Sequence, residues 1–324
     1  MKFTEAMLEE YSKPLSETED NHCKNAIRMV SDALKPLGFT DDGKGITKLC
    51  ADTFAYSIEL KNSSEGRQIK IFVQGSYANN TNVRTKSDVD IAVVQEDVFQ
   101  TKYRTSGSYI QSDADYNFFT VKARPISFKD EVEKCLKVKF GKDVERRKKS
   151  IKVHGNAYRK DADAVPCKRY RDYTNDYRKD VNNYIGAISI LTDDGETIIN
   201  YPEQHIKNGR EKNNATHYLY KKLVRIVKKM RYMMEENGYK STQNVSSFAL
   251  ESLLWNIQDS YYLEWGKYRK VYAFKRLIEL LISQKSQFSQ YKEANGIKDL
   301  FKDNAQINNM LEFLIDLNDF YEYE

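Results

Sequence analysis

The sequence has few of the residues that mark disulfide-rich, zinc-binding or fibrous proteins. Its 324 residues include only four cysteines, four histidines and five prolines. Cys23, Cys50, Cys135 and Cys167 form no CxxC pair, and no histidine stands at metal-ligand spacing from them. We therefore predict buried, reduced thiols instead of a disulfide framework or a zinc site.

Long apolar runs are also missing. No window approaches the run of about eighteen uncharged apolar residues that a membrane-spanning helix requires. The first residues, MKFTEAMLEEYSKPLSETED, lack the basic start and apolar run of a secretory signal. The sequence therefore predicts a cytoplasmic protein.

The chain does contain enough apolar material for a core. Hydrophobic residues make up 40% and aromatic residues 12% of a length that suits one large or two ordinary domains. The formal charge of +5 is unevenly spread, because residues 207–231 hold nine Lys or Arg and a single acid. This composition argues against a disordered chain and against a fibrous repeat.

Strand-like alternation of apolar and polar residues predicts a sheet between about residues 50 and 200. The candidates are TFAYSIEL at 53–60, IKIFVQ at 69–74, DVDIAVVQ at 88–95, IKVHGN at 151–156, DADAVPCKRYR at 161–171 and YIGAISIL at 184–191. Helical spacing is predicted after Ser16 and in FKDEVEKCLKVKF at 128–140. A mixed sheet with flanking helices follows from this mixture.

Beyond Tyr201 the apolar residues recur only at helical spacing. The polar stretch NGREKNNATH at 208–217 predicts a loop that leads into the long basic helix. The predicted fold class is therefore α+β, with the sheet and the N-terminal helix in residues 1–200 and a helical lobe in residues 201–324.

Two aspartates, Asp88 and Asp90, alternate with apolar residues in SDVDIAVV. In a strand both carboxylates project from the same face, so they repel each other unless a dense positive charge lies between them. Oxygen ligands of this kind suit Mg²⁺, which completes its shell with waters and substrate phosphates. The pair predicts a divalent-metal site, and the alternative is a solvated pair on a surface strand.

Gly75 and Ser76 follow directly on the strand candidate that ends at Gln74. Glycine lets the backbone approach a ligand closely, and the following amides and the Ser76 hydroxyl can donate hydrogen bonds to phosphate. Such a pair alone is common by chance. The Gly75–Ser76 pair, however, lies in a turn between two strand candidates and shortly before Asp88. This context predicts a site for a nucleoside triphosphate that is bound through its metal.

A third carboxylate is expected, because phosphoryl and nucleotidyl transfer commonly use two metal ions. The candidates in YRKDADAVPCKRYR are Asp161 and Asp163. We assign Asp163, since an acid within a strand is harder to explain as a turn residue. Its role would be to bind the catalytic ion and to draw the proton from an incoming hydroxyl.

These motifs carry a resemblance to a known superfamily. GSYANNTNV, SDVDIAVV and DAVPC resemble the nucleotidyltransferases that include DNA polymerase beta, poly(A) polymerases and oligoadenylate synthetase. NYPEQHIKNG, KKLVRIVKKMR and SSFALESLLWNI are similar to the bacterial branch called CD-NTases, and within it to clade E. The similar segments span about residues 70 to 257.

The resemblance implies a two-lobed polymerase-beta-like fold with the active site in the cleft between the lobes. It implies that a 3′ or 2′ hydroxyl attacks an alpha phosphate, that pyrophosphate leaves, and that repetition closes a cyclic di- or oligonucleotide. The implied cofactor is Mg²⁺, with Mn²⁺ as a substitute. In this family the product activates an effector in anti-phage (CBASS) defence, and structured RNA or DNA activates some members.

Carried over to this sequence, Gly75 and Ser76 match the phosphate-binding pair, and Asp88, Asp90 and Asp163 match the metal triad. Lys228 matches a phosphate-binding lysine, Ser247 a triphosphate-contacting serine, and Phe248 an aromatic residue against the base. Alternatives remain for the last three. Lys228 could belong to a solvated basic face, Ser247 could be a helix N-cap, and Phe248 could be ordinary core.

Two other functions remain open from the sequence. A nucleic-acid-binding sensor would use ERRKKSIK at 145–152 and the basic helix that contains Lys228. A nucleotidyltransferase with another acceptor would act on RNA ends, a protein or a small molecule. No additional RNA-reading module is evident in support of the RNA-end enzyme.

Overall fold

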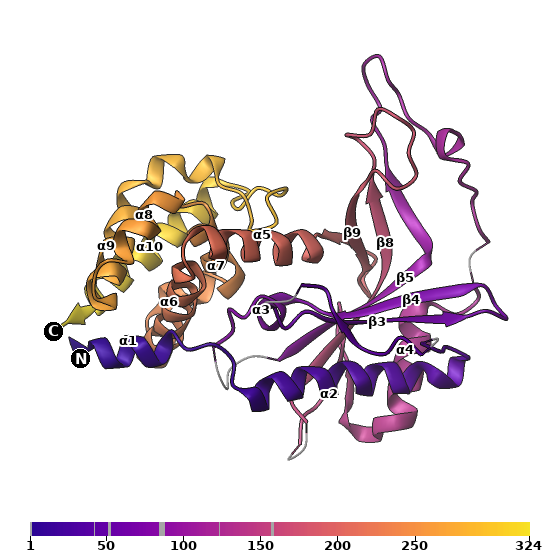
Figure 1. The fold of residues 1–324 in the computed structure, drawn as a ribbon, viewed down its shortest axis with the longest axis horizontal. Coiled ribbons are helices and arrows are strands. Elements are labelled where there is room, and N and C mark those ends of the chain that lie inside the picture. Colours follow the sequence, from indigo (N-terminus) through magenta and orange to yellow (C-terminus); the bar gives the residue numbers. More distant parts are fainter. Residues whose placement is uncertain (1, 42, 51–52, 84–87, 123, 157–158) are drawn as a thin grey trace. The chain divides into compact units, whose positions relative to one another are not determined.

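The structure is a computed structural model that describes residues 2–41, 43–50, 53–83, 88–122, 124–156 and 159–324 (Figure 1). Its contacts divide the described chain into two compact units. The sheet unit contains residues 17–78 and 88–203, and the helical unit contains residues 2–16, 79–83 and 204–324. Residues 2–16 and 79–83 thus pack with the C-terminal helices, which the linear division of the sequence did not anticipate.

The sheet unit is built on a nine-stranded mixed sheet in the order β10-β9-β8-β5-β4-β3-β2, with β7 pairing β8 and β6 pairing β7. The strands are β2 Thr47–Lys48, β3 Tyr56–Asn62, β4 Arg67–Val73, β5 Val89–Lys102, β6 Val144–Arg146, β7 Ile151–Val153, β8 Ala162–Asp172, β9 Ile185–Leu191 and β10 Thr197–Asn200. Among these pairs β5 and β8 run parallel, and the other neighbours run antiparallel. All six predicted strands are present.

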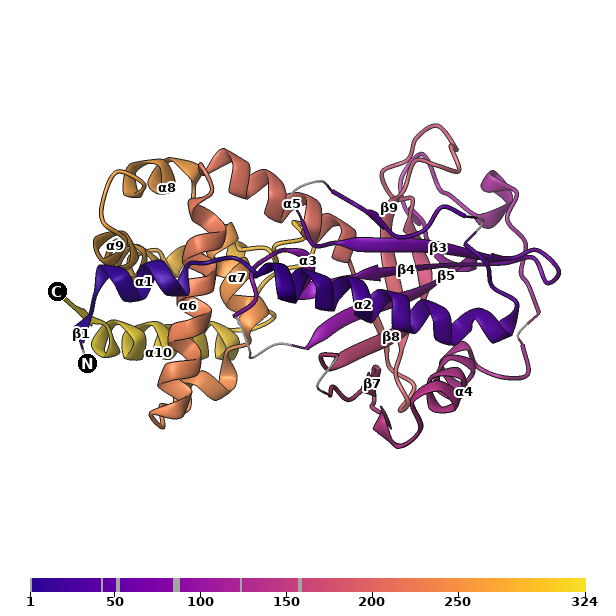
Figure 2. The ribbon, with the colours of Figure 1, turned by 60° about the horizontal axis from the view of Figure 1, so that its bottom comes forward.

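Two helices, α2 Glu17–Leu34 and α4 Phe128–Phe140, lie side by side on one face of this sheet (Figures 1 and 2). The predicted apolar stripe of α2, including Ile27 and Val30, is buried. A separate apolar cluster is formed by Phe72, Ala92, Val94, Val165, Cys167, Ile188 and Ile190. Because side chains alternate along a strand, Asp90 belongs to the face of β5 that carries Ala92 and Val94.

The helical unit contains α1 Glu5–Tyr11, α5 Pro202–Ala215, α6 Leu219–Glu236, α7 Ser247–Trp255, α8 Asp259–Trp265, α9 Lys270–Ser283 and α10 Asn304–Phe320. A short parallel pair joins β1 Lys2–Phe3 to β11 Glu322–Tyr323. Leu223, Ile226, Val227 and Met230 of α6 lie in the buried core, as the helical spacing predicts. Short 3₁₀ turns occupy Lys35–Leu37, Asp113–Tyr116, Gly141–Asp143, Lys240–Asn244 and Lys285–Gln290.

The loop predicted at 208–217 is wrong, because most of this stretch lies in α5. Tertiary contacts override its polar composition. Asn208 donates a hydrogen bond to the carbonyl of Ala294, and Lys212 is held by the carbonyl of Ile257 and by Asp259. Helices in folded proteins are stabilised largely by such contacts and less by local propensity.

The cysteines agree with the predicted reduced thiols. All four are free, and Cys23, Cys135 and Cys167 are buried. Within the described residues, no helix combines the length and the apolar character that crossing a bilayer requires.

Candidate active site

Two of the predicted metal ligands lie opposite each other on neighbouring strands of the sheet unit. In the parallel pairing of β5 with β8, Asp90 is the direct partner of Asp163. One step earlier, the backbone amide of Val89 donates to the carbonyl of Asp161 at 2.9 Å. Cross-strand partners share a face, so the carboxylates of Asp90 and Asp163 project from the same side of the sheet. Long-range strand pairing therefore joins acids that stand more than seventy positions apart.

The negative charge of the Asp90 carboxylate is poorly compensated by its surroundings. Its burial, followed by the negative charges of Asp163 and Asp88, raises the pKa of Asp90 to about 7. Burial is also the largest influence on Asp163 and raises the pKa of that carboxyl, against the lowering effect of Arg147. Arg147 lies 3.7 Å from Asp163, a distance typical of a loose ion pair. The acids thus form a local excess of negative charge.

Asp88 is turned toward a lysine. Lys152, on β7, places its Nζ 2.8 Å from Oδ2 of Asp88 and 2.5 Å from Oδ2 of Asp161. The other oxygen of Asp161 accepts the Gly155 amide at 2.5 Å. These interactions lower the pKa of Asp161 against the opposing effect of burial. Asp161 is therefore an anchored side chain, whereas Asp90 and Asp163 are not bound in this way.

Gly75 lies against the acid pair. It begins the short helix α3 Gly75–Ala78, directly after β4, and the Gln74 amide donates to the Asp90 carbonyl at 2.9 Å. The φ of Gly75 is +67°, and a Cβ at this position would collide with Oδ2 of Asp90. Only glycine combines this backbone conformation with such a close approach. Ser76 follows at a partly exposed position.

The residues of this cluster fit a divalent cation. Their donor set consists of carboxylate oxygens, the ligand type that Mg²⁺ and Mn²⁺ prefer. In the described part of the chain, no hydrogen bond or ion pair joins the side chain of Asp90 to another residue, although this carboxyl is partly buried. Among the same residues, no three His, Cys, Asp or Glu side chains already converge as a complete metal site. A cation here would therefore need ligands beyond the present arrangement, such as water and substrate phosphate.

The three remaining candidates belong to the helical unit. Lys228, on α6, is only 3% exposed, so the alternative of a solvated basic face is wrong. Its Nζ lies 2.5 Å from Oε2 of Glu251 and 3.3 Å from the Thr81 hydroxyl. The other oxygen of Glu251 lies 2.7 Å from Nε2 of His205. Lys228 is thus a member of a buried ion network, and its role in binding phosphate stays a prediction.

Ser247 and Phe248 open helix α7. The N-cap is Ser246, whose hydroxyl accepts the Ala249 amide, so the alternative that Ser247 caps the helix is wrong. Phe248 is 37% exposed, which contradicts the alternative of ordinary core. Its ring forms a T-shaped pair with the His205 ring, with 5.1 Å between the ring centroids. An exposed ring backed by a second ring is a surface on which a planar group can stack.

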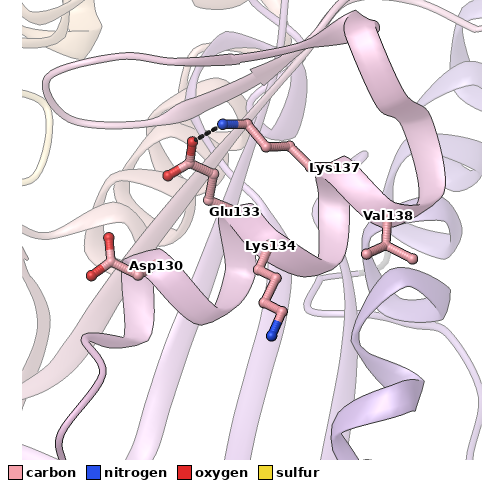
Figure 3. Close-up of a pocket in the computed structure, with 5 residues that line it drawn as sticks. All are labelled: Asp130, Glu133, Lys134, Lys137 and Val138. Carbon is pink, nitrogen blue, oxygen red and sulfur yellow. Dashed lines mark ion pairs between the residues drawn. The ribbon is translucent and has the colours of Figure 1, made fainter.

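A shallow hollow on α4 is a different kind of surface (Figure 3). Asp130, Glu133, Lys134, Lys137 and Val138 line it. Glu133 and Lys137 pair at 2.6 Å across one turn of the helix, and Val138 is exposed. All five side chains come from one helix, so the hollow lacks the convergent polar groups of a binding site.

Three residues of these sites were not predicted from the sequence. Lys152 was counted as part of a basic surface run, and Glu251 and His205 were not singled out. The sequence contains one usable signal, because Lys152 follows Ile151 in a segment predicted as a strand that lies close to Asp161 along the chain. No comparable local signal marks the pairing of Glu251 with Lys228.

Two family profiles match this chain. The nucleotidyltransferase domain matches residues 57–184, which include Gly75, the paired aspartates and Asp163. The cGAS/DncV-like nucleotidyltransferase C-terminal helical domain matches residues 207–322. The cyclic GMP-AMP synthase CdnE03 of Staphylococcus schleiferi is 45% identical over 324 residues, which are 100% of this chain and 98% of the relative. The chain belongs to the CD-NTase family.

Other CD-NTases agree along most of the chain. The cyclic dipurine nucleotide synthase of Elizabethkingia meningoseptica is 31% identical over 94% of this chain and 93% of its own length. A solved structure of the CdnE cyclic dinucleotide synthase of the same organism, with GTP and Apcpp, superposes with a TM-score of 0.70 and 29% identity, and covers 98% of this chain and 99% of that one. The Rhodothermus marinus CdnE c-UMP-AMP synthase, with Apcpp and Upnpp, gives a TM-score of 0.72 at 26% identity, covering 99% and 98%.

These comparisons confirm the predicted family, the α+β fold class and the predicted enzyme class. The chain is a nucleotidyltransferase, a class of enzyme that acts on nucleoside triphosphates with the help of a divalent metal. The assignments of individual site residues stay predictions, and the geometry above is what supports them.

Proposed function

We propose that this CD-NTase joins nucleoside triphosphates into a cyclic di- or oligonucleotide and releases pyrophosphate. The observation that carries the proposal is the register of β5 and β8, which sets Asp90 directly opposite Asp163 on one face of the sheet. Asp88 stands two residues before Asp90 and adds its charge to the same cluster. Relatives along the whole chain are cyclic nucleotide synthases, which supports the same reaction class.

In this proposal Asp88, Asp90 and Asp163 hold Mg²⁺, or Mn²⁺ in its place. The bound metal supplies charge that stabilises the attacking and leaving oxygens. Asp163 draws the proton from the attacking ribose hydroxyl. The Gly75–Ser76 turn offers backbone amides and a hydroxyl to triphosphate oxygens, and the absence of a side chain at Gly75 allows this approach beside Asp90.

Lys228, Ser247 and Phe248 complete the proposal from the helical unit. Phe248 would stack on a base, an interaction that contributes about 1–3 kcal/mol per base. Ser247 would donate to the triphosphate. Lys228 would add positive charge to the phosphate site, although its ammonium group is already bound by Glu251.

The biological setting is part of the same proposal. The enzyme would act in the cytoplasm in CBASS anti-phage signalling, where an effector recognises its cyclic product, and structured RNA would act as an activator.

The two segments that favoured a nucleic-acid sensor are largely engaged within the protein. Arg146 is bound by Asp193 at 2.8 Å, and Lys148 by Asp194 at 2.6 Å. Lys221 and Arg225 of α6 are buried. The basic segments therefore give the sensor alternative little support.

The experiment is incubation of the purified protein with the four labelled triphosphates and Mg²⁺ or Mn²⁺, with and without structured RNA. Phosphatase treatment and chromatography then separate closed rings from linear products. We expect a phosphatase-resistant product that Asp88→Asn and Asp90→Asn abolish, with thermal unfolding showing that both variants are folded. Asp161→Asn is the matched control and retains measurable synthesis at saturating metal.

Undiminished synthesis by Asp90→Asn would refute the metal-site assignment. Label incorporated into lengthened RNA, with no cyclic product on chromatography, would refute the cyclic product and favour the alternative acceptor. RNA binding without any nucleotide product would favour the sensor.

A further inference from the structure

Lys152 occupies a central place in the acid cluster. In the antiparallel pairing of β7 with β8, Lys152 is the direct partner of Asp163. Asp163 is in turn the partner of Asp90 in the pairing of β8 with β5. The three residues therefore form one row across three adjacent strands, and cross-strand partners share a face. A lysine thus stands on the same side of the sheet as the carboxylates that we assign to the metal.

The side chain of Lys152 is specifically held. The residue is 7% exposed, and its ammonium group bridges Asp88 and Asp161 at 2.8 and 2.5 Å. Burial of an ammonium group is costly unless carboxylates surround it, so both acids are needed to keep Lys152 in this position. The two ion pairs raise the pKa of Lys152 against the effect of burial, and the group stays charged. Arg147 is a further cation near the cluster, and its guanidinium lies 3.7 Å from Asp163.

The two acids that Lys152 bridges differ in their other partners. Asp161 also accepts the Gly155 amide, which fixes it in place. For the Asp88 side chain, the pair with Lys152 is the one hydrogen bond or ion pair within the described residues. Asp88 therefore has two competing uses, since the carboxylate that Lys152 binds is one that the proposed metal also needs. Asp161 supplies a fixed point to which Lys152 stays attached when Asp88 changes partner.

We propose that Lys152 is a positioning residue that holds Asp88 before metal binds and releases it to the incoming divalent cation, so that it sets the metal affinity of the site. The inference rests on the proposed function, because it assumes that Asp88 is a metal ligand. The lysine neutralises part of the acid cluster in the metal-free enzyme. It also repels the cation and competes for Asp88, so the site binds metal more weakly than the same acids would without it.

The sign of the effect follows from this competition. Replacing Lys152 by methionine keeps a long unbranched side chain and removes the charge. The variant should lose stability in the metal-free state, because the acids lose their nearest cation. Its affinity for a divalent cation should increase, by about tenfold, because one positive charge no longer opposes the ion. A merely structural lysine would change the stability and leave the metal affinity unaltered.

The test is a titration of the full-length protein with Mn²⁺ alone, in which electron paramagnetic resonance measures the free ion. The wild type, Lys152→Met, Lys152→Arg, Lys149→Met and Asp90→Asn are compared without nucleotide. Lys149 is exposed in the same basic segment, so Lys149→Met removes an equal charge without touching the acid cluster. We expect Lys152→Met to bind Mn²⁺ about tenfold more tightly than the wild type, and Lys149→Met to bind within about twofold of it.

Lys152→Arg keeps the charge and both ion pairs, and it tests the inference even where the methionine variant folds poorly. Its affinity for Mn²⁺ should equal that of the wild type or be lower, because a guanidinium binds carboxylates through paired donors. Equal affinities for Lys152→Met and Lys149→Met, or an Lys152→Arg variant with higher affinity than the wild type, would overturn the inference alone. A wild type that binds no Mn²⁺ at this site, and that therefore does not differ from Asp90→Asn, would overturn the proposed metal site as well.

Discussion

The two units use buried carboxylates in opposite ways. In the helical unit, Glu251 is 1% exposed and each of its oxygens has a partner, the Lys228 ammonium group on one and the His205 ring on the other. In the sheet unit, Asp90 stands beside two further acids and has no such partner among the described residues. The first carboxyl has its pKa held well below the usual range, and the second has its pKa raised to about 7.

The difference separates a structural site from a site prepared for a ligand. A buried carboxylate with satisfied oxygens is fixed by its partners and has no capacity left for another cation. A carboxylate that is destabilised by neighbouring acids is stabilised when a cation binds. Such clusters are typical of functional sites. The network of Glu251 also draws Thr81 to the helices, since the Thr81 hydroxyl donates to Oε2 of Glu251 at 2.7 Å. That bond ties the segment after Ala78 to the helical unit.

The largest effect is expected from Glu251→Gln, which breaks the satisfied network. The change leaves Lys228 and His205 buried without their acid, and breaking a buried ion pair in this way costs about 3–5 kcal/mol. Urea denaturation should show this loss in the free energy of unfolding. Glu279→Gln, at a surface position on α9, is the control and should stay within about 0.5 kcal/mol of the wild type. A neutral effect of Glu251→Gln would mean that the two carboxylates do not differ as described.

The next effect has the opposite sign. Asp90→Asn removes the unfavourable charge, so the metal-free protein should become more stable at pH 8, by about 2 kcal/mol. The pKa of Asp90 is raised in the folded state, so the wild type loses stability as the pH rises from about 4 to about 7, and the loss is complete above that range. At pH 4 or below, the variant and the wild type should therefore unfold alike as far as this residue is concerned.

The measurement is thermal unfolding in EDTA at the two pH values. In EDTA-free buffer at pH 8, added Mn²⁺ should stabilise the wild type and leave Asp90→Asn unchanged. A variant that is less stable than the wild type at pH 8 would show that Asp90 is compensated by a favourable interaction, and the comparison between the units would lose its basis.

How far the sequence could predict these two sites depends on how local their signals are. Some signals are patterns of residues that are close together in the chain. These are the Asp88 and Asp90 pair, the Gly75–Ser76 turn and the alternation of β5, and the alternation predicts the sheet. Asp163 was preferred to Asp161 because an acid within a strand is harder to explain as a turn residue. The register of β5 with β8, in which Asp163 is the partner of Asp90, supports this prediction.

What the sequence could not predict is set by partners that are distant in the chain. Lys228 belongs to a stripe of basic residues that looks solvated, and its burial depends on Glu251 in another helix. Lys152 belongs to a basic run, but its acids are Asp161, directly before β8, and Asp88, directly before β5. The polar composition of α5 favours a loop, and the helix forms because Asn208 and Lys212 contact Ala294 and Asp259, which are distant in the chain.

The smallest effect is expected at Asp161, which anchors Lys152. It tests whether Asp161 influences Asp88 through the lysine that bridges them. Asp161→Asn removes one of the two negative charges on Lys152, so the lysine should hold Asp88 more strongly and Mn²⁺ should bind about threefold more weakly. Part of that loss would arise simply from the missing charge near the ion. A double-mutant cycle separates the two causes, because Asp161→Asn in the Lys152→Met background lacks the lysine through which coupling would act. If the change in Mn²⁺ affinity is as large in that background as in the wild type, Asp161 acts on the ion directly and Lys152 does not connect the two acids.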